Sequence, residues 1–313
     1  MSALPSPDNC ISLVVPCFNE EAAIPLLYDE TVKIFASINE SFEFVFVDDG
    51  SKDATLQILR QLANNDSRVH FVSFSRNFGK EAAMLAGLRA AHGRYVLILD
   101  ADLQHPPSLI PQMLEMIVSG QYDCIVAKRT RKGDPPLRSL FAGSFYRIFS
   151  KLVDAQIADG IGDFRLMTNA YVDAILQLEE RNRFSKGIYP WIGFRTGCIE
   201  YENVKRAAGI TKWSFFKLVF YSMDGIIAFS TKLLSFVSII GLLSFFLAIV
   251  LFILFILRKL IVGVSVDGFT SIICLIVFFS GIILLSIGIT GQYMAKIYTE
   301  VKQRPHYIIR EAK

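Results

Sequence analysis

The stretch YVLILDADLQHPP, from Tyr95 to Pro107, decides how the first two-thirds of the chain fold. It passes from an apolar, β-branched run into two aspartates separated by one alanine, and then into prolines of the kind that open a helix. The same passage from an apolar run to a polar cluster occurs upstream, at Pro16–Glu21, Asp48–Ser51 and Ser75–Lys80. This repeated alternation predicts an α/β domain with a mostly parallel sheet and helices on both faces.

The expected elements follow from the spacing of apolar residues. The predicted strands are Ile11–Val15, Phe42–Val47, Val69–Phe74, Tyr95–Leu99 and Asp123–Ala127, and the predicted helices are Glu20–Phe35, Asp53–Leu62, Glu81–Ala91 and Ser108–Val118. Ligands of such sheets bind at the carboxyl ends of the strands, which is where the four polar clusters fall. Any one cluster alone would more often be turn or helix-cap chemistry, so it is their coincidence that predicts a binding site.

Asp100 and Asp102 are the candidate metal ligands within this site. Two carboxylates with that spacing can reach one divalent cation, which prefers oxygen ligands and completes its shell with water or substrate phosphates. A lone pair of this kind is weak evidence, because many are solvated turns. We expect His105 to support the turn rather than to bind the metal.

The remaining third of the chain is apolar enough to cross a membrane. Residues from Leu233 to Leu257 form a run of 25 positions without a charge, which as a helix would span about 37 Å against a hydrocarbon core of about 30 Å. Phe269–Ala295 is a second uncharged stretch with three glycines, which allow close helix contacts, between protomers included. Buried helices of a soluble core are the alternative, but these seldom run so long without a polar residue.

Basic residues flank both spans and predict their orientation. Lysines and arginines precede the first span between Lys205 and Lys232 and follow the second between Lys296 and Arg310. Both termini are therefore expected in the cytoplasm. Trp213–Ile227 mixes aromatics with lysines and predicts an amphipathic helix in the headgroup region. Net charge is only +3, and no basic run is interleaved with aromatics, so nucleic acid is not expected as a partner.

These features divide the chain into four expected regions. They are a cytosolic α/β domain (1–204), a juxtamembrane amphipathic region (205–231), a transmembrane hairpin (232–295, with helices at about 233–257 and 269–293) and a cytosolic tail (296–313).

Six motifs, in this order, resemble the family 2 glycosyltransferases of GT-A fold, and within them the polyprenyl-phosphate glycosyltransferases. They are VVPCFNEE (Val14–Glu21), VDDGSKDAT (Val47–Thr55), SRNFGKEAAMLAGL (Ser75–Leu88), LDADLQHPP (Leu99–Pro107), DFRLM (Asp163–Met167) and RAAGITKW (Arg206–Trp213). The resemblance is strongest to the bactoprenol glucosyltransferases. It implies inverting transfer of one sugar, glucose from UDP-glucose, to undecaprenyl phosphate at the cytoplasmic face of the plasma membrane, for modification of a cell-envelope glycan.

The resemblance also implies roles for individual residues. It implies that the donor is bound by Pro16, Asn19, Glu20, Asp48, Asp49, Lys80 and Asp100. It further implies that a metal ion, Mg²⁺ or Mn²⁺, is bound by Asp102 with Asp100 and Gln104. The position of the catalytic carboxylate falls on Asp163. An acceptor phosphate has a second pKa of about 6, so its attacking oxygen is largely deprotonated at neutral pH and needs a strong general base less. Asp163 is therefore expected to orient substrate as much as to take a proton. An ion pair with Arg165 is its alternative, purely structural role.

The acceptor phosphate requires cations, and arginine has the forked donors that suit it. The candidates are Arg129, Arg131, Arg138, Arg206 and Lys212. The basic segment from Lys128 to Lys132 can equally be a solvated loop.

Other functions fit parts of the same pattern. A dolichyl-phosphate mannose synthase-like enzyme that uses GDP-mannose differs mainly in nucleotide and sugar, and an enzyme transferring N-acetylglucosamine or a modified pentose would leave the same motifs. A processive polysaccharide synthase needs a translocation channel of several spans and usually has a QxxRW motif, whereas this chain has two expected spans and no such motif. A non-catalytic membrane scaffold would have lost its acidic residues, whereas Asp48, Asp100, Asp102 and Asp163 are all present.

Overall fold

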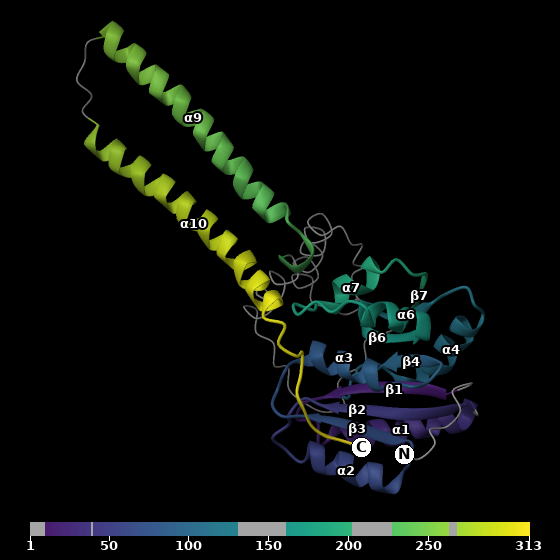
Figure 1. The fold of residues 1–313 in the computed structure, drawn as a ribbon. Helices are drawn as coiled ribbons and strands as arrows, with labels where there is room; N and C mark the ends of the chain where they lie inside the picture. The colour runs from purple at the N-terminus through teal and green to yellow at the C-terminus, as the bar shows by residue number, and fades with distance from the viewer. Residues whose placement is uncertain (1–9, 39, 131–160, 202–226, 263–267) are drawn as a thin grey trace.

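The computed structural model describes residues 10–38, 40–130, 161–201, 227–262 and 268–313. It consists of an α/β domain from which two long helices project, α9 (Lys232–Val262) and α10 (Phe269–Val301) (Figure 1). The residues predicted to form the juxtamembrane region, up to residue 226, and the predicted phosphate ligands Arg131, Arg138, Arg206 and Lys212 lie outside the described residues.

The described strands form one eight-stranded sheet in the order β7-β5-β6-β4-β1-β2-β3-β8. Their bounds are β1 (Cys10–Cys17), β2 (Ser41–Asp48), β3 (Val69–Phe74), β4 (Tyr95–Ile98), β5 (Cys124–Arg129), β6 (Ile161–Thr168), β7 (Thr196–Tyr201) and β8 (Ile309–Ala312). Strands β3, β2, β1 and β4 are parallel, and so are β5 and β7, whereas β6 runs antiparallel to β4 and β5. The expectation of a mostly parallel α/β sheet is confirmed.

Helices cover both faces of this sheet because alternate residues of each strand point to opposite sides. One face packs on α1 (Ala23–Ile38), α2 (Thr55–Asn65), the short 3-10 helix η1 (Pro107–Leu109) and α4 (Ile110–Val118); the other packs on α3 (Lys80–Ala90), α6 (Asn169–Leu176) and α7 (Ser185–Trp191). In β1, Leu13 and Val15 contribute to the first core and Val14 to the second. Continuous apolar strands are therefore buried on both sides.

Helix α3 lies unusually close to the sheet at Gly87. A β-carbon at this position would come within 2.2 Å of Val14 Cγ1 and 3.3 Å of Val47 Cγ2. Glycine therefore permits the helix to approach β1 and β2. This contact matters for the site, because Lys80 begins the same helix.

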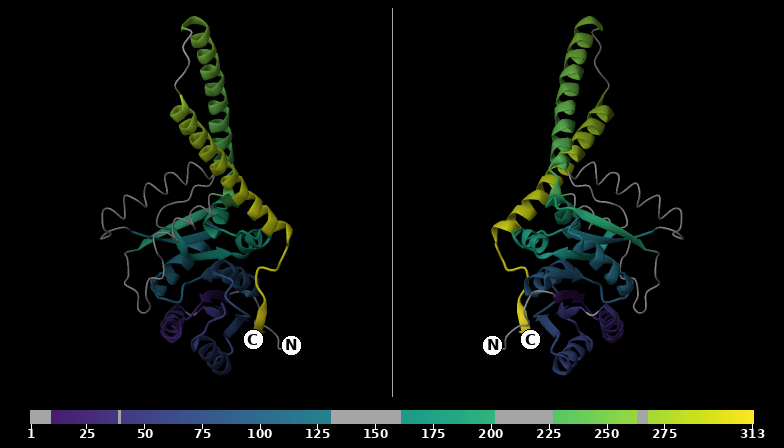
Figure 2. Two further views of the ribbon diagram at one scale, coloured as in Figure 1. Left: turned by 90° about the vertical axis from the view of Figure 1, so that its left-hand side faces the viewer. Right: turned by 90° about the vertical axis from the view of Figure 1, so that its right-hand side faces the viewer.

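The C-terminal tail returns to the domain and adds a strand to the sheet. After α10, strand β8 pairs antiparallel with β3 (Figure 2). Arg60 Nη2 forms an ion pair with Glu311 at 2.5 Å, and Lys313 Nζ donates to the carbonyl of Ala63 at 2.8 Å. The tail thereby covers the edge of β3, which would otherwise present unpaired backbone groups. The sequence pattern did not predict this pairing.

Helices α9 and α10 are each long and apolar enough to cross a membrane, over Lys232–Leu254 and Leu275–Val301. Where the structure describes their side chains, most of the large apolar residues of these helices are exposed rather than packed in a protein core. An exposed apolar surface of that size is typical of segments that contact lipid, which fits the two membrane spans expected from the sequence. The last turns of α10 contact the α/β domain: Lys296 Nζ donates to Asn182 Oδ1 at 3.0 Å, and Glu300 Oε2 accepts from the backbone N–H of Arg181 at 2.9 Å.

Candidate active site

The carboxyl end of β2 carries a buried aspartate that organises the neighbouring turns. Asp48 Oδ1 accepts from the backbone N–H of Ser51 at 2.9 Å, and its Oδ2 accepts from the Ser73 hydroxyl at 2.7 Å. The Ser51 hydroxyl in turn accepts from the backbone N–H of Asn19 at 3.0 Å. Asp48 is 1% exposed, so its hydrogen bonds join the ends of β1, β2 and β3 from below the surface.

Asp49 fixes the loop that follows β3. Its two carboxylate oxygens accept from the backbone N–H groups of Phe78 at 2.6 Å and Gly79 at 2.9 Å. Burial raises the pKa of Asp49 and outweighs these two hydrogen bonds, which lower it. The turn is compact: Gly50 has φ +66°, and a β-carbon there would lie 2.5 Å from the Arg76 carbonyl carbon. The loop is thereby held so that α3 begins directly over the strand ends.

The first residue of α3, Lys80, joins two aspartates. Its ammonium lies 2.6 Å from Asp100 Oδ1 and 2.7 Å from Asp163 Oδ2. The side chains are 44% exposed for Lys80, 26% for Asp100 and 14% for Asp163, so the cluster opens to solvent on the lysine side. The alternative pairing of Asp163 with Arg165 is not the one formed. Arg165 is buried, its Nη2 donates to the carbonyl of Gly162, and its guanidinium lies 3.2 Å from the ring centroid of Tyr189.

The antiparallel pairing of β6 with β4 explains why Asp163 reaches Asp100. The register pairs Leu97 with Leu166 and Ile98 with Arg165. Continuing that register by two residues brings Asp100 opposite Asp163. The last paired residues are thus followed by two carboxylates facing each other, and Lys80 neutralises part of their repulsion.

The ion cluster sets the charge of each member. Burial favours protonation of Asp163 and of Asp100, but the Lys80 ammonium outweighs it and lowers the pKa of both carboxylates. Partial loss of water around the Lys80 ammonium likewise works against its charge, and the two carboxylates outweigh this effect and hold the pKa of Lys80 well above its usual value. All three groups are therefore charged at neutral pH.

A second set of side chains closes the other flank of Asp100. His105 Nε2 lies 3.5 Å from Asp100 Oδ2, and its Nδ1 is 2.7 Å from the hydroxyl of Tyr201. The pKa of Tyr201 is raised to about 12, mainly by burial; Asp100 and Asp102 also raise it, and Arg129 lowers it. Arg129, the only acceptor-phosphate candidate among the described residues, pairs in register with Tyr201, so it ends β5 on this side of the site.

Helix α7 is tied to the cluster by the residue after Lys80. Glu81 accepts hydrogen bonds from both the hydroxyl and the backbone N–H of Ser185, the first residue of α7. The charge of Lys186 adds to the lowering of the Asp163 pKa. Glu81, Ser185, Lys186 and Tyr201 were not predicted as site residues. Glu81 lies within the Ser75–Leu88 motif and could have been considered with Lys80, whereas no predicted strand or motif covers the other three.

The strand-end residues present suit a divalent cation. Asp102 Oδ1 accepts from the backbone N–H of Gln104 at 3.2 Å, which holds the carboxylate in the turn after β4. Leu103 adopts a left-handed φ of 57° in that turn. Carboxylate oxygens of this kind are the donors that Mg²⁺ and Mn²⁺ prefer. Within the described residues no group of three or more acidic, histidine or cysteine side chains forms a closed cage, so any ion here would need donors from substrate or water.

The other predicted donor residues line the same end of the sheet. Asn19 has a left-handed φ of 55°, and its Oδ1 accepts from the backbone N–H of Lys52 at 2.8 Å. The Glu20 backbone N–H donates to the Thr55 hydroxyl at 2.9 Å, and Pro16 lies beside Val47 in the sheet. The structure therefore brings together the four strand ends that the sequence pattern placed at one site.

The domain that carries this site has a recognisable sequence. Residues 12–176 match the family described as Glycosyl transferase family 2, a span that includes every strand end discussed above from Pro16 to Asp163. The chain belongs to glycosyl transferase family 2. It is therefore a glycosyltransferase, and its α/β domain has the GT-A fold that the sequence motifs predicted.

Relatives of this family 2 glycosyltransferase match along nearly the whole chain. A protein of Bacillus subtilis named putative glycosyltransferase CsbB is 44% identical over 302 residues, covering 96% of this chain and 92% of the relative. The bactoprenol glucosyl transferase of Shigella phage SfV is 42% identical over 305 residues, covering 97% and 99%. The similarity therefore extends through α9 and α10.

Among solved structures, glucosyl-3-phosphoglycerate synthase from Mycobacterium tuberculosis, in a complex with Mn²⁺, UDP-glucose and phosphoglyceric acid, matches with a TM-score of 0.47 and 19% identity. The match covers 70% of this family 2 glycosyltransferase and 78% of the solved chain. A similarity of that strength assigns neither a donor nor a metal to this protein.

Proposed function

We propose that the protein transfers one sugar, glucose from UDP-glucose, to undecaprenyl phosphate at the cytoplasmic face of the membrane. The observation that carries the proposal is the cluster of Lys80, Asp100 and Asp163 at the strand ends of a domain from which two apolar helices project. Relatives that match over nearly the whole chain are named bactoprenol glucosyl transferase, which supports a polyprenyl phosphate as the acceptor.

The donor would bind over the ends of β1, β2 and β3. Asp48 is buried and already accepts two hydrogen bonds, so we assign it a structural role at the floor of the donor pocket. Its remaining lone pairs could accept a hydrogen bond from the nucleobase of the donor. Asn19, Glu20 and Pro16 form the adjacent wall. Lys80 contributes a positive charge beside the sugar and diphosphate, and Asp100 a carboxylate that accepts from donor hydroxyl groups.

Asp163 would act mainly by position. Its pKa is lowered by Lys80, so it is a weak base at neutral pH. A weak base suffices for a phosphate acceptor, whose oxygen is already largely deprotonated above about pH 6. We assign to Asp163 the orientation of the attacking oxygen and of Lys80, with inversion at the sugar carbon because one displacement occurs.

A divalent ion, Mg²⁺ or Mn²⁺, would be held by Asp102 with Asp100 and Gln104. When bound, such an ion stabilises the negative charge that accumulates on a departing nucleoside diphosphate. Asp100 already contacts Lys80 and His105, so Asp102 is the residue on which we expect binding of the ion to depend most.

The acceptor would come from the bilayer. Both helix termini near the domain lie on one side: α9 begins beside it, and α10 ends in contact with residues 181 and 182. We therefore propose a multi-pass protein with the catalytic domain and both chain termini in the cytoplasm. A lipid phosphate at that surface would face Arg129 at the end of β5.

The test uses the purified full chain with undecaprenyl phosphate, Mg²⁺ or Mn²⁺, and labelled UDP-glucose, UDP-N-acetylglucosamine and GDP-mannose in separate reactions. We expect label from UDP-glucose to enter the lipid phase. Label from GDP-mannose alone would replace the donor assignment, and transfer only to a soluble sugar would overturn the acceptor assignment.

Variant D102A separates an enzyme from a non-catalytic scaffold. We expect at least about a hundred-fold loss of transfer, the scale on which single electrostatic groups act in catalysis. Asp29→Ala, which removes an exposed carboxylate from α1, is the matched control and should be active. Unchanged lipid glycosylation by D102A would contradict the metal site.

A further inference from the structure

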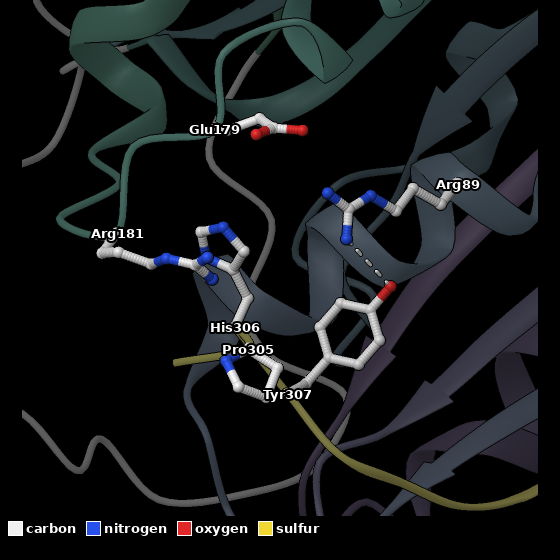
Figure 3. A pocket seen from close by; sticks show the side chains of 6 residues that line it. All are labelled: Arg89, Glu179, Arg181, Pro305, His306 and Tyr307. Atoms are coloured by element: carbon white, nitrogen blue, oxygen red, sulfur yellow. Dashed lines mark hydrogen bonds between the residues drawn. The ribbon is translucent and has the colours of Figure 1, made fainter. Parts of the chain in front are cut away.

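A hollow lies outside the active site, where the chain after α10 crosses the α/β domain. It has a volume of about 270 Å³ and is lined by Arg89, Glu179, Arg181, Pro305, His306 and Tyr307 (Figure 3). We call it the tail pocket. Three separate segments form it: the end of α3, the loop after α6, and the tail between α10 and β8.

Two arginines face this hollow from opposite segments. Arg89 Nη1 lies 3.5 Å from the Tyr307 hydroxyl, a long contact, and Arg181 is held through its backbone N–H to Glu300. Figure 3 shows both guanidinium groups directed toward the space between the segments. In the described part of the chain neither guanidinium forms an ion pair with a carboxylate. Forked donors without an acid partner on a concave surface suit a phosphate group.

The pKa of His306 reflects the positive charges that surround the pocket. Burial lowers the pKa of His306, and the charges of Arg181, Arg183 and Arg89 lower it further, against a hydrogen bond with the Glu179 backbone that raises it. The imidazole is therefore neutral at pH 7 and can donate or accept one hydrogen bond. The pocket is positive where the tail lies over it.

Glu179 also lines the pocket, and it restricts the ligand. Figure 3 places its carboxylate on the wall away from the tail, facing the same space as Arg89. A carboxylate would repel a polyanion but would accept a hydrogen bond from a hydroxyl or ammonium group. The lining therefore fits a small molecule with one phosphate and a neighbouring hydroxyl or amine.

We propose that the tail pocket binds such a phosphate ester, with the phosphate between Arg89 and Arg181. The chemistry is shared by a phospholipid headgroup and a soluble phosphate ester. The site lies beside the last turn of α10, because Arg181 is bonded to Glu300, so either source has access. This inference does not depend on which sugar or acceptor the active site uses.

The pocket is connected to the active site through two elements. Helix α3 runs from Lys80 to Arg89, a rise of about 13 Å. The loop that carries Arg181 leads to Ser185, which is bonded to Glu81. A ligand that joins these elements to the tail would stabilise the chain without touching the reacting groups.

The experiment uses the full chain in phosphatidylcholine nanodiscs, with UDP added to occupy the donor site. Inorganic phosphate and glycerol phosphate are the soluble probes, and nanodiscs containing phosphatidylglycerol supply the lipid probe. The thermal midpoint measures binding, since a ligand that binds the folded state raises it. A response to glycerol phosphate alone would identify a soluble ligand, and a response to phosphatidylglycerol alone a headgroup.

Variants R89Q and R181Q, singly and together, test the assignment. We expect the double variant to bind the active probe at least about ten-fold more weakly, with each single variant intermediate, as loss of one or more charge-assisted hydrogen bonds predicts. R94Q removes an exposed arginine that does not line the pocket and should bind normally. Sugar transfer by the variants shows that they are folded. The proposal is overturned if no probe shifts the wild-type midpoint, or if the double variant responds as the wild type does.

Discussion

Replacing Gly87 with alanine tests whether the close approach of α3 to the sheet positions Lys80. The added β-carbon would lie 2.2 Å from Val14 Cγ1, and ordinary contacts begin near 3.4 Å. The helix or the valine must therefore move by about 1 Å, an overpacking that costs about 1–3 kcal/mol. A contact this short falls in the upper part of that range, about 2–3 kcal/mol, and alanine recovers about 1 kcal/mol through its helix propensity, so we expect a net loss of about 1–2 kcal/mol.

A double-mutant cycle with Val14→Ala isolates this contact. V14A alone removes two buried methyl groups and should cost about 2 kcal/mol, counting about 0.8 kcal/mol for each group and a cavity term. In the double variant the new β-carbon occupies the space that Cγ1 has left. We therefore expect a loss at least about 1 kcal/mol smaller than the sum of the two single losses.

The measurements are the thermal midpoint of the full chain at one scan rate, and sugar transfer. A loss of about 1–2 kcal/mol corresponds to roughly 2–8 °C for a domain of this size. Because the displaced helix carries Lys80, transfer by G87A should fall more than its midpoint suggests, and should recover in the double variant. A midpoint for G87A equal to that of the wild type, or strictly additive losses, would refute this account of the packing.

Three further outcomes are expected. Replacing Lys80 by methionine removes the cation that lies within 2.7 Å of one oxygen of Asp100 and one of Asp163, and leaves the two carboxylates facing one another. Sugar transfer should therefore fall at least about ten-fold. The control Lys33→Met, at an exposed position on α1, should have no effect. The lowered aspartate pKa values imply that this ion cluster stabilises the wild type fully above about pH 4, the usual aspartate value, and less as the pH falls further. In K80M, burial and the mutual repulsion of the two carboxylates favour their protonation, so the variant is penalised less as the pH falls. The midpoint difference between wild type and K80M should therefore be largest near pH 7 and shrink steadily in acid, and a difference that grows in acid would show that the sign is wrong. Replacing Ser185 by alanine removes the hydroxyl group that donates to Glu81 and should lower the thermal midpoint by about 2–6 °C. Ser119→Ala, at the exposed end of α4, should leave the midpoint unchanged. Equal effects of the two substitutions would argue that the Glu81–Ser185 contact does not anchor α7.

Local pattern was sufficient for the first part of the fold. The strands up to β5 and the helices between them were predicted because each element is short, apolar and followed by its own turn residues. The sequence pattern also predicted, for the same reason, that the polar residues at those strand ends lie together. Parallel strands joined by helices share one direction, so their carboxyl ends must meet.

Strands β6 and β8 could not be predicted in this way, and they complete the site and its attachment. Nothing near Asp163 in the sequence indicates that β6 enters the sheet between β4 and β5. Ile309–Ala312 is short and partly charged, and it resembles a solvated tail until it is paired with β3. Pairing between strands that are distant in sequence depends on which edge of the sheet is free in the folded domain, and local sequence patterns do not contain that information.

The sequence by itself determined an α/β domain with acidic strand ends, two apolar spans, and a family. Only the tertiary structure decided that Lys80 lies between Asp100 and Asp163, that Glu81 anchors α7, and that the tail returns to the sheet. The physical reason is that strand ends are fixed by local periodicity and turn chemistry. The charge of each group at the site depends instead on partners brought within about 3 Å by an antiparallel register and a closely packed helix.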